Sequence, residues 1–194
     1  LFLASATVAV LVGTLYPLLL EALTGDTISV GAPFFNLTFG AIMAPLLILL
    51  PFGPFLAWKR GDFVAAAQRL AGAAALAVFA TILAFSLAGV SISLAPLGLL
   101  LGFWVAFGAL ADLADRIKLF RTSLTVSWHR LVGLPRSAFA TALAHFGMGM
   151  SVIGIVAASA WQVEEVTTMA PGGTVQIGDY SVTFLGTNHV EGPN

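Results

Sequence analysis

Leu70 to Val90 reads LAGAAALAVFATILAFSLAGV, a run without a single ionisable side chain. A helix needs about 20 mostly apolar residues to cross a bilayer core of roughly 30 Å, so this run is long enough to span a membrane. Four more stretches meet the same criterion, at residues 1–20, 37–57, 94–111 and 137–160. The sequence therefore predicts an all-α polytopic membrane protein with five transmembrane helices.

The composition excludes most soluble classes of protein. Of the 194 residues, 59% are hydrophobic and 9% are charged, whereas a soluble domain carries about 25% charged residues. A net charge of −1 provides no basic field for nucleic acid. Because cysteine is absent, disulfides, thiolate zinc sites, iron–sulfur clusters and cysteine nucleophiles are excluded. Leu1 is not a start methionine and no signal-peptide pattern follows it, so we expect a piece of a larger membrane protein.

The basic residues predict the orientation of the chain. They fall in two connections, between spans two and three and between spans four and five: Lys59, Arg60, Arg69, Arg116, Lys118, Arg121, Arg130 and Arg136. Five alternating crossings put both connections on one side, and the positive-inside rule makes that side cytoplasmic. The connection between spans one and two carries acidic residues and no Lys or Arg, and so does the C-terminal tail. We therefore predict a cytoplasmic N-terminus and an external C-terminus.

Two segments outside the spans have patterns of their own. Residues 112–136 form a basic inner loop, in which we expect an interfacial helix. In the tail, Val175 and Ile177 alternate with polar residues, and Gly178-Asp179 can form a two-residue turn before a second alternating run. We predict a β-hairpin here. Residues 1–160 are then the transmembrane region, and residues 161–194 the truncated beginning of a periplasmic β domain.

His145 is the only ionisable residue inside the five predicted spans. It lies eight residues after Ser137, about 12 Å into the membrane at 1.5 Å per residue. Ionisable groups in this setting face a protein interior and mark functional sites, and neutral imidazole is a good axial ligand for haem iron. Gly149 shares the helix face of His145 and keeps it low enough for a porphyrin or another helix, while Met148 adds a polarizable contact.

Three interpretations of His145 remain open at this stage. It can hydrogen-bond a neighbouring helix while the glycines mark a packing interface, it can ligate haem iron, or it can relay protons. A relay requires a second ionisable group, which the other spans lack. Bis-histidine ligation requires a second histidine, but the predicted topology puts His129 and His189 on opposite sides of the membrane. Neither can reach His145, so a second ligand has to come from outside these residues.

The remaining polar residues predict no catalytic centre. His129, in a Ser-Trp-His-Arg sequence, is typical of an interfacial residue beside an aromatic anchor, and His189 is typical of a surface residue. Asp112 and Asp115 flank Arg116 at a helix exit, where we expect a local charge cluster. No glycine run is followed by the Lys and Ser/Thr pair of a phosphate loop. The catalytic residues therefore stay unknown.

Several short motifs occur in a recognisable order. They are GTLYP at 13–17, ISVGAPFFN at 28–36, GP at 53–54 followed by WKR at 58–60, AHFG at 144–147 and EGPN at 191–194. Together they resemble the central to C-terminal part of the CcmF/NrfE family, the haem lyase membrane subunit of bacterial cytochrome c maturation. The resemblance covers nearly the whole chain and is weakest in spans three and four and the inner loop.

The resemblance implies a function on the outer face of the bacterial inner membrane. Members of the family attach haem, delivered by a periplasmic haem chaperone, to apocytochrome c with the help of thiol-handling partners. They also hold a b haem in the membrane. His145 matches one of the two transmembrane histidines that ligate this b haem, with the other ligand in the N-terminal half of the protein. The tail matches the beginning of a periplasmic domain.

Departures from the family pattern leave alternatives open. The tryptophan-rich segment that receives chaperone-borne haem is absent, since the four tryptophans of this chain are isolated from one another. One alternative function is a segment of a membrane transporter, with haem as a candidate cargo. Helices interrupted near Pro17 and Pro45 would line its path, because proline frees backbone carbonyls. Another is a structural module that docks partner subunits of a membrane assembly complex. No nucleic-acid partner is expected.

Overall fold

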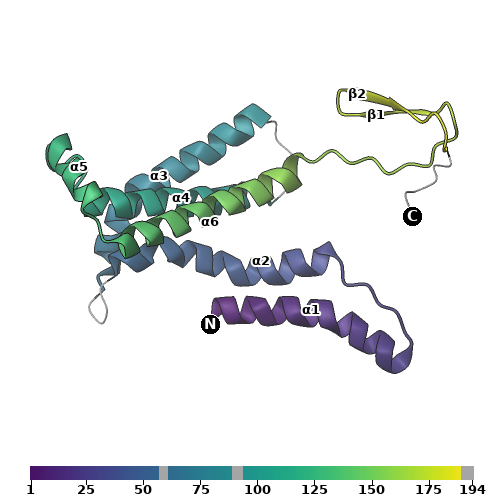
Figure 1. Cartoon of the computed structure of the whole chain (residues 1–194), viewed down its shortest axis with the longest axis horizontal. Helices are drawn as coiled ribbons and strands as arrows, with labels where there is room; N and C mark the ends of the chain where they lie inside the picture. The colour runs from purple at the N-terminus through teal and green to yellow at the C-terminus, as the bar shows by residue number, and fades with distance from the viewer. Residues whose placement is uncertain (57–60, 89–93, 189–194) are drawn as a thin grey trace.

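Figure 1 shows the chain as a computed structural model that describes residues 1–56, 61–88 and 94–188. Five helices are long and apolar enough to cross a membrane, which confirms the predicted all-α fold class. In chain order the elements are α1 (Phe2–Thr24), α2 (Ala32–Leu49), the 3-10 helix η1 (Leu50–Phe55), α3 (Phe63–Ala88), α4 (Ala95–Arg116), α5 (Leu124–Val132), α6 (Arg136–Trp161), β1 (Thr174–Ile177) and β2 (Tyr180–Thr183).

The helix α4 forms the centre of the bundle. It packs against α3 and α6, and η1 covers part of its remaining surface, whereas α1 packs mainly on α2 and stands apart from the other helices (Figure 1). Leu99 and Val105 of α4 are almost completely buried, as is Leu70 of α3. The core of the chain is therefore the contact of α4 with its two neighbours.

The first two helices meet where a glycine faces two aromatic rings. A methyl group at Gly13 would lie 2.7 Å from the Phe34 ring and 2.8 Å from the Phe35 ring. These phenylalanines belong to α2, which begins at Ala32 and not at the predicted residue 37. Pro33 suits the first turn of a helix because its missing N–H has no intrahelical partner there. The aromatic pair thus serves as the packing surface for α1 and not as part of the preceding loop.

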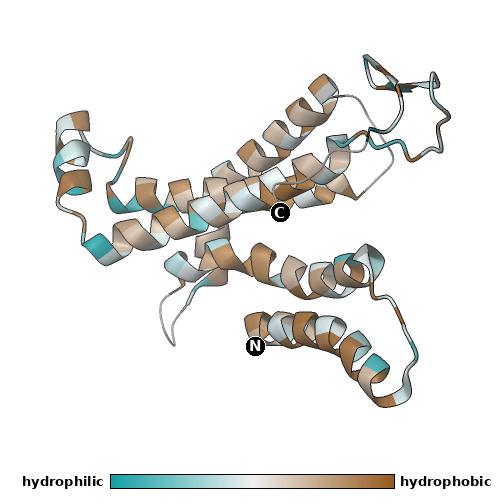
Figure 2. Ribbon diagram, turned by 45° about the vertical axis from the view of Figure 1, so that its right-hand side comes forward, coloured by the Kyte–Doolittle hydropathy of each residue, from teal (hydrophilic) through white to brown (hydrophobic). Residues whose placement is uncertain are grey.

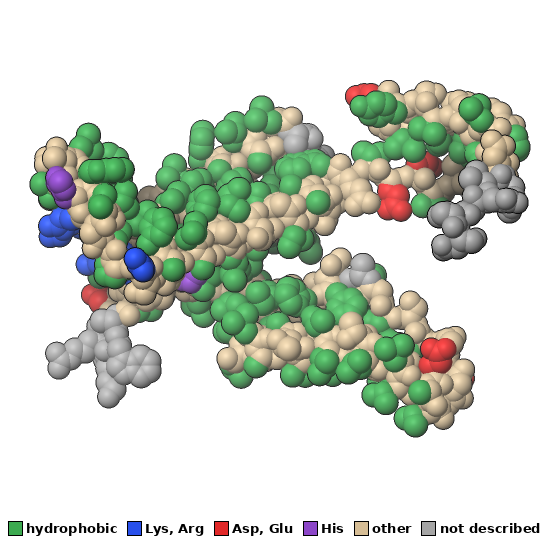
Figure 3. Space-filling view, in the orientation of Figure 1, with side chains coloured by type: hydrophobic (Ala, Val, Ile, Leu, Met, Phe, Trp, Pro, Cys, Tyr) green, Lys and Arg blue, Asp and Glu red, His purple; other side chains and the backbone are tan. Residues whose placement is uncertain are grey.

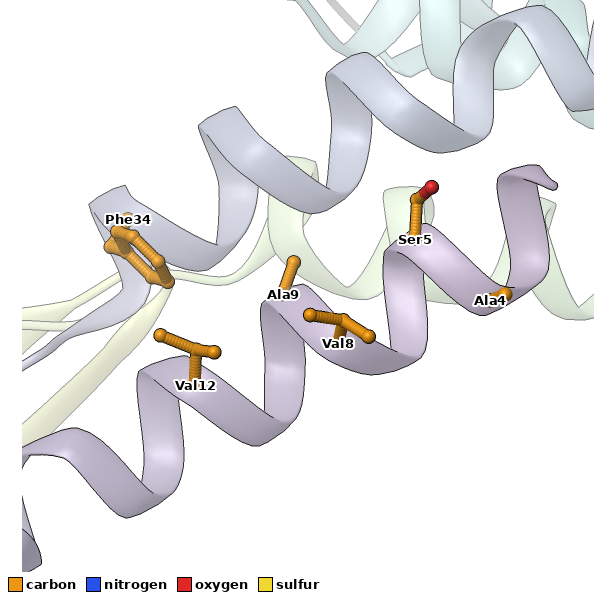
Figure 4. Close-up of a pocket in the computed structure, with 6 residues that line it drawn as sticks. All are labelled: Ala4, Ser5, Val8, Ala9, Val12 and Phe34. Atoms are coloured by element: carbon orange, nitrogen blue, oxygen red, sulfur yellow. The ribbon is translucent and has the colours of Figure 1, made fainter.

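A shallow apolar pocket lies on the other side of this contact, along α1 (Figure 4). One serine hydroxyl is its single polar side chain, and its lining consists of Ala4, Ser5, Val8, Ala9, Val12 and Phe34. A lining without a titratable group has no means of acid–base or metal chemistry. This pocket is therefore a gap between membrane-spanning surfaces and not a candidate chemical site.

Both α1 and α2 are continuous through their internal prolines. The helix α1 runs through Pro17, and α2 runs through Pro45, so the interruptions considered for a transporter path are not found at these positions. The regular helix ends instead at Leu49, where η1 begins with Pro51 in its first turn.

Trp104 of α4 supports this end of α2. Its indole Nε1–H donates to the Ile48 carbonyl at 3.0 Å, and its ring contacts that of Phe52. Carbonyls at the end of α2 lose helical partners because the chain tightens into η1 and Pro51 has no N–H. Trp104 therefore joins α4 to the end of α2 through a backbone carbonyl.

Replacing Trp104 with phenylalanine should lower the free energy of unfolding by about 1 kcal/mol, since the Ile48 carbonyl loses its donor in an apolar setting. The measurement is unfolding of the detergent-solubilised chain by sodium dodecyl sulfate, followed by circular dichroism. The matched control is Trp128→Phe, at an exposed tryptophan of α5, which should unfold like the original chain. Equal stability of the two variants would contradict the structural role of Trp104.

The C-terminal strands confirm the predicted hairpin. β1 pairs with β2 in an antiparallel register that joins Thr174 to Thr183 and Ile177 to Tyr180. The connecting Gly178 has φ of 58°, a left-handed conformation that glycine adopts without steric cost and that two-residue hairpin turns require. In Figure 1 the hairpin stands away from the helices at the end of an extended segment. Its identity as the beginning of a periplasmic domain stays a prediction.

Apolar and charged side chains occupy different zones of the surface. The helices are apolar along most of their length (Figure 2), and the large side chains of Leu18, Phe79 and Ile155 are each more than half exposed. The Lys and Arg side chains visible in Figure 3 gather at the end of the bundle that carries α5. Because water would penalise such an apolar surface, it fits a lipid environment. The chain is a multi-pass membrane protein, whose orientation stays a prediction.

Candidate functional site

The candidate ligand His145 lies well inside α6. Pro135 precedes the first residue of this helix with φ of −54°, and His145 follows Arg136 by nine residues, about 14 Å along the axis. The side chain is half-buried, and among the described residues no hydrogen bond to it is found. The interpretation that His145 hydrogen-bonds a neighbouring helix is therefore not supported among the described residues.

The face of α6 next to His145 is closed by α4. A methyl group at Gly149 would lie 2.6 Å from the Ala106 backbone nitrogen and 2.7 Å from the Gly102 carbonyl oxygen. Gly98, Gly102 and Ala106 recur at every fourth position of α4, the small-residue spacing that lets membrane helices approach closely. Gly149 therefore lets α4 pack closely against α6, which agrees with the alternative that the glycines mark a packing interface. The side of α6 that Gly149 leaves without a side chain is covered by α4.

The other neighbours of His145 face outward. Met148 is 37% exposed, and a methyl group at Gly147 would meet nothing within 4 Å. Phe146 is half-buried. The approach to His145 that remains is therefore along the outer flank of α6 and not from the α4 side.

The burial of one carboxylate in α4 was not predicted from the sequence. The helix extends past the predicted residue 111 to Arg116, which places Asp112 within it at 4% exposure. Asp112 Oδ1 accepts from Arg116 Nε at 2.8 Å, and Asp112 Oδ2 has no partner among the described residues. His145 is still the ionisable residue deepest within its helix among the described residues. The sequence signal for this burial was the spacing: Asp112 follows Gly108 by four residues and Val105 by seven, which puts it on the buried face of the helix.

The predicted charge cluster is present and larger than expected. Asp115 pairs with Arg69 of α3 at 3.3 Å and with Arg121 at 3.3 Å. Together with the pair of Asp112 and Arg116, these contacts join α3, α4 and the segment that follows at one end of the bundle. All of these groups except Asp112 retain contact with solvent, so the cluster is a helix-end network and not a closed ion site.

The other histidines do not complete a metal site. His129 is exposed on α5, and His189 lies outside the described residues. No group of three or more His, Cys, Asp or Glu gathers anywhere in the described ranges. His145 is thus the one histidine of the described residues that lies inside a membrane-length helix.

Comparison with known proteins identifies relatives of the whole chain. It is 55% identical to the cytochrome c-type biogenesis protein CycK of Rhizobium meliloti over 194 residues, which is all of this chain and 29% of the relative. It is 36% identical to CcmF of Pseudomonas aeruginosa, covering 95% of this chain and 27% of the relative. The match to CcmF of Escherichia coli is 32% identical over 99% of this chain and 28% of the relative.

These identities extend over all five helices and the hairpin. Close homologues of the chain are the cytochrome c-type biogenesis proteins CycK, CcmF and NrfE. It spans less than one third of the length of the curated CcmF and CycK relatives that it matches. No family model matches the chain, and no solved structure matches it. The identities to CycK and CcmF confirm the resemblance inferred from the short motifs.

Proposed function

We propose that this chain forms a membrane section of a cytochrome c-type biogenesis protein, with His145 as one axial ligand of a b haem. Its CcmF and CycK relatives are named as cytochrome c-type biogenesis proteins. The observation that carries the proposal is the imidazole of His145, deep in α6 and without a hydrogen bond among the described residues. In an apolar environment an unpaired polar group is costly, so a ligand for its nitrogen is expected.

The surroundings of His145 fit one side of a flat ligand. Met148 follows His145 by three residues, so the two side chains share a face of α6, and the partly exposed Met148 can supply apolar contact there. We leave Gly149 out of the proposed site because α4 covers it. A b haem would supply one-electron redox chemistry when bound. His145 would hold it as a neutral imidazole.

The second axial ligand belongs, on this proposal, to a part of the protein outside this chain. Among the described residues, His145 belongs to no group of three or more His, Cys, Asp or Glu side chains. The further partners proposed are a haem chaperone, thiol-handling proteins and apocytochrome c at the periplasmic face of the inner membrane. Attachment of haem to apocytochrome c would also require the tryptophan-rich segment, which these 194 residues do not contain.

The visible spectrum of the purified chain tests this proposal. The chain is solubilised in detergent, alone and co-expressed with the N-terminal part of Rhizobium meliloti CycK. Co-expression should produce a low-spin b-type spectrum that the chain alone lacks. His145→Ala should abolish that spectrum, because the iron loses one axial ligand, whereas His145→Met should change the band positions and raise the reduction potential.

His129→Ala is the matched control. It also removes a histidine, but from the exposed surface of α5, and should leave the spectrum unchanged. Helicity measured by circular dichroism shows whether each variant folds. Haem that survives in a folded His145→Ala variant with unchanged bands would overturn the assignment, and His145 would then be a packing residue.

A further inference from the structure

The short helix α5 crosses the end of the bundle. Figures 1 and 2 both show it at a steep angle to α4 and α6, beyond the ends of the long helices. It is held on one side by Ser127, which is 3% exposed and lies with its Oγ 3.2 Å from Thr122 Oγ1. If the long helices cross the bilayer, α5 therefore lies close to the plane of the membrane surface.

Another face of α5 is an unpartnered apolar row. Leu124, Trp128 and Val132 follow one another at every fourth position, and they are 73%, 62% and 71% exposed. Residues with this spacing share one face of a helix. His129 and Arg130 lie elsewhere on the helix surface, so α5 is amphipathic. Tryptophan with aliphatic neighbours beside basic residues is typical of a helix at a membrane interface.

The turn before α5 carries a lysine in a position that favours glycine. At the end of α4, the Leu119 N–H donates to the Ala114 carbonyl and the Lys118 N–H donates to the Asp115 carbonyl. These two bonds form a Schellman motif, whose left-handed residue is usually glycine. Here it is Lys118, with φ of 52°. A left-handed conformation is unfavourable for a lysine.

The cations around α5 are only partly neutralised. Arg69, Arg116 and Arg121 pair with carboxylates. Lys118, Arg130 and Arg136 have no carboxylate partner in the part of the chain that the structure describes. Three uncompensated cations thus lie on α5, in the turn before it and at the start of α6.

We propose that α5 and the turn before it form a binding surface for anionic phospholipid headgroups. The row of Leu124, Trp128 and Val132 lies at the acyl boundary, while Lys118, Arg130 and Arg136 contact the phosphates. Charge complementarity selects this occupant, because an anionic lipid offers both the apolar and the negative component that the surface lacks. The position of α5 at the end of five membrane-length helices favours lipid over a protein partner.

Quenching by brominated lipids tests the proposal with the whole 194-residue chain in vesicles. The vesicles mix phosphatidylcholine with phosphatidylglycerol at fixed composition, and bromine is placed on the chains of either one lipid or the other. The signal of Trp128 is the difference between the original chain and Trp128→Phe. Quenching should be stronger when bromine is on phosphatidylglycerol, and added salt should weaken this preference.

Lys118→Gly separates charge from folding. It removes a cation but relieves the left-handed conformation, so thermal stability should be unchanged or higher. The preference for phosphatidylglycerol should fall about fivefold, the effect expected of one cation near an anionic surface. Lys118→Arg keeps the charge and should keep the preference.

Two results would overturn the proposal. Equal quenching by the two brominated lipids would mean that the surface does not select anionic headgroups. Absence of quenching by either lipid would mean that Trp128 lies outside the interface, and would assign the apolar row to a protein partner.

Discussion

Gly149→Leu is expected to separate α4 from α6 and to destabilise the chain by about 3 kcal/mol. The first side-chain carbon would lie 2.6 Å from the Ala106 nitrogen and 2.7 Å from the Gly102 oxygen. Both of these atoms belong to the backbone and cannot rotate aside, so the two helices have to move apart. Since α4 is the centre of the bundle, its other contacts should weaken as well.

The matched control for this variant is Gly147→Leu. It makes the same replacement two residues earlier on the same helix, where a side-chain carbon meets nothing within 4 Å. Leucine also favours a helix over glycine by up to about 1 kcal/mol, so Gly147→Leu should be neutral or stabilising. Unfolding in sodium dodecyl sulfate compares the two variants. Similar losses of stability in both would argue against close packing of α4 and α6 at Gly149.

Removing Arg116 is expected to cost more than neutralising its partner. Arg116→Ala leaves the Asp112 carboxylate buried with no partner among the described residues, which should lower the free energy of unfolding by about 2 kcal/mol. The loss is moderated because the Arg116 side chain is 36% exposed and the pair is partly screened by solvent. Asp112→Asn removes the charge, keeps the shape, and should cost less than about 1 kcal/mol.

A double-mutant cycle separates these contributions. In the Arg116→Ala background, Asp112→Asn should restore stability, because the uncompensated charge is gone. Chemical unfolding of the four proteins at neutral pH provides the coupling free energy. If the two substitutions were simply additive, the ion pair would make no contribution to the stability of α4.

The membrane-spanning helices could be predicted because the requirement that defines them is local. A bilayer sets the length of an apolar run, and each run can be recognised without knowing its neighbours. The hairpin could be predicted for a similar reason, since alternation on both sides of Gly178-Asp179 depends on adjacent residues. Helix ends were less certain. Asp112 and Asp115 were placed in a loop, whereas their pairing with arginines lets α4 continue to Arg116.

The surroundings of His145 could be predicted only in part. Its depth in α6 follows from counting residues, but which of its neighbours face a ligand depends on where α4 lies. Gly147 and Gly149 are equivalent as sequence, yet the first is open and the second is covered. The left-handed Lys118 was equally hidden, because nothing in its local sequence has the glycine that usually marks a helix end.

The sequence by itself determined that this chain forms five membrane-length helices, resembles the CcmF and CycK proteins, and carries one deeply placed histidine. The length of apolar runs, the positions of charges and the short motifs are local features of the sequence, so they can be recognised without knowledge of the fold. Only the tertiary structure decided that α4 is the central helix, that it fills the face beside Gly149, and that α5 lies across the bundle end. The first two features arise from contacts between residues far apart in sequence, where one missing methyl group decides whether two helices can touch.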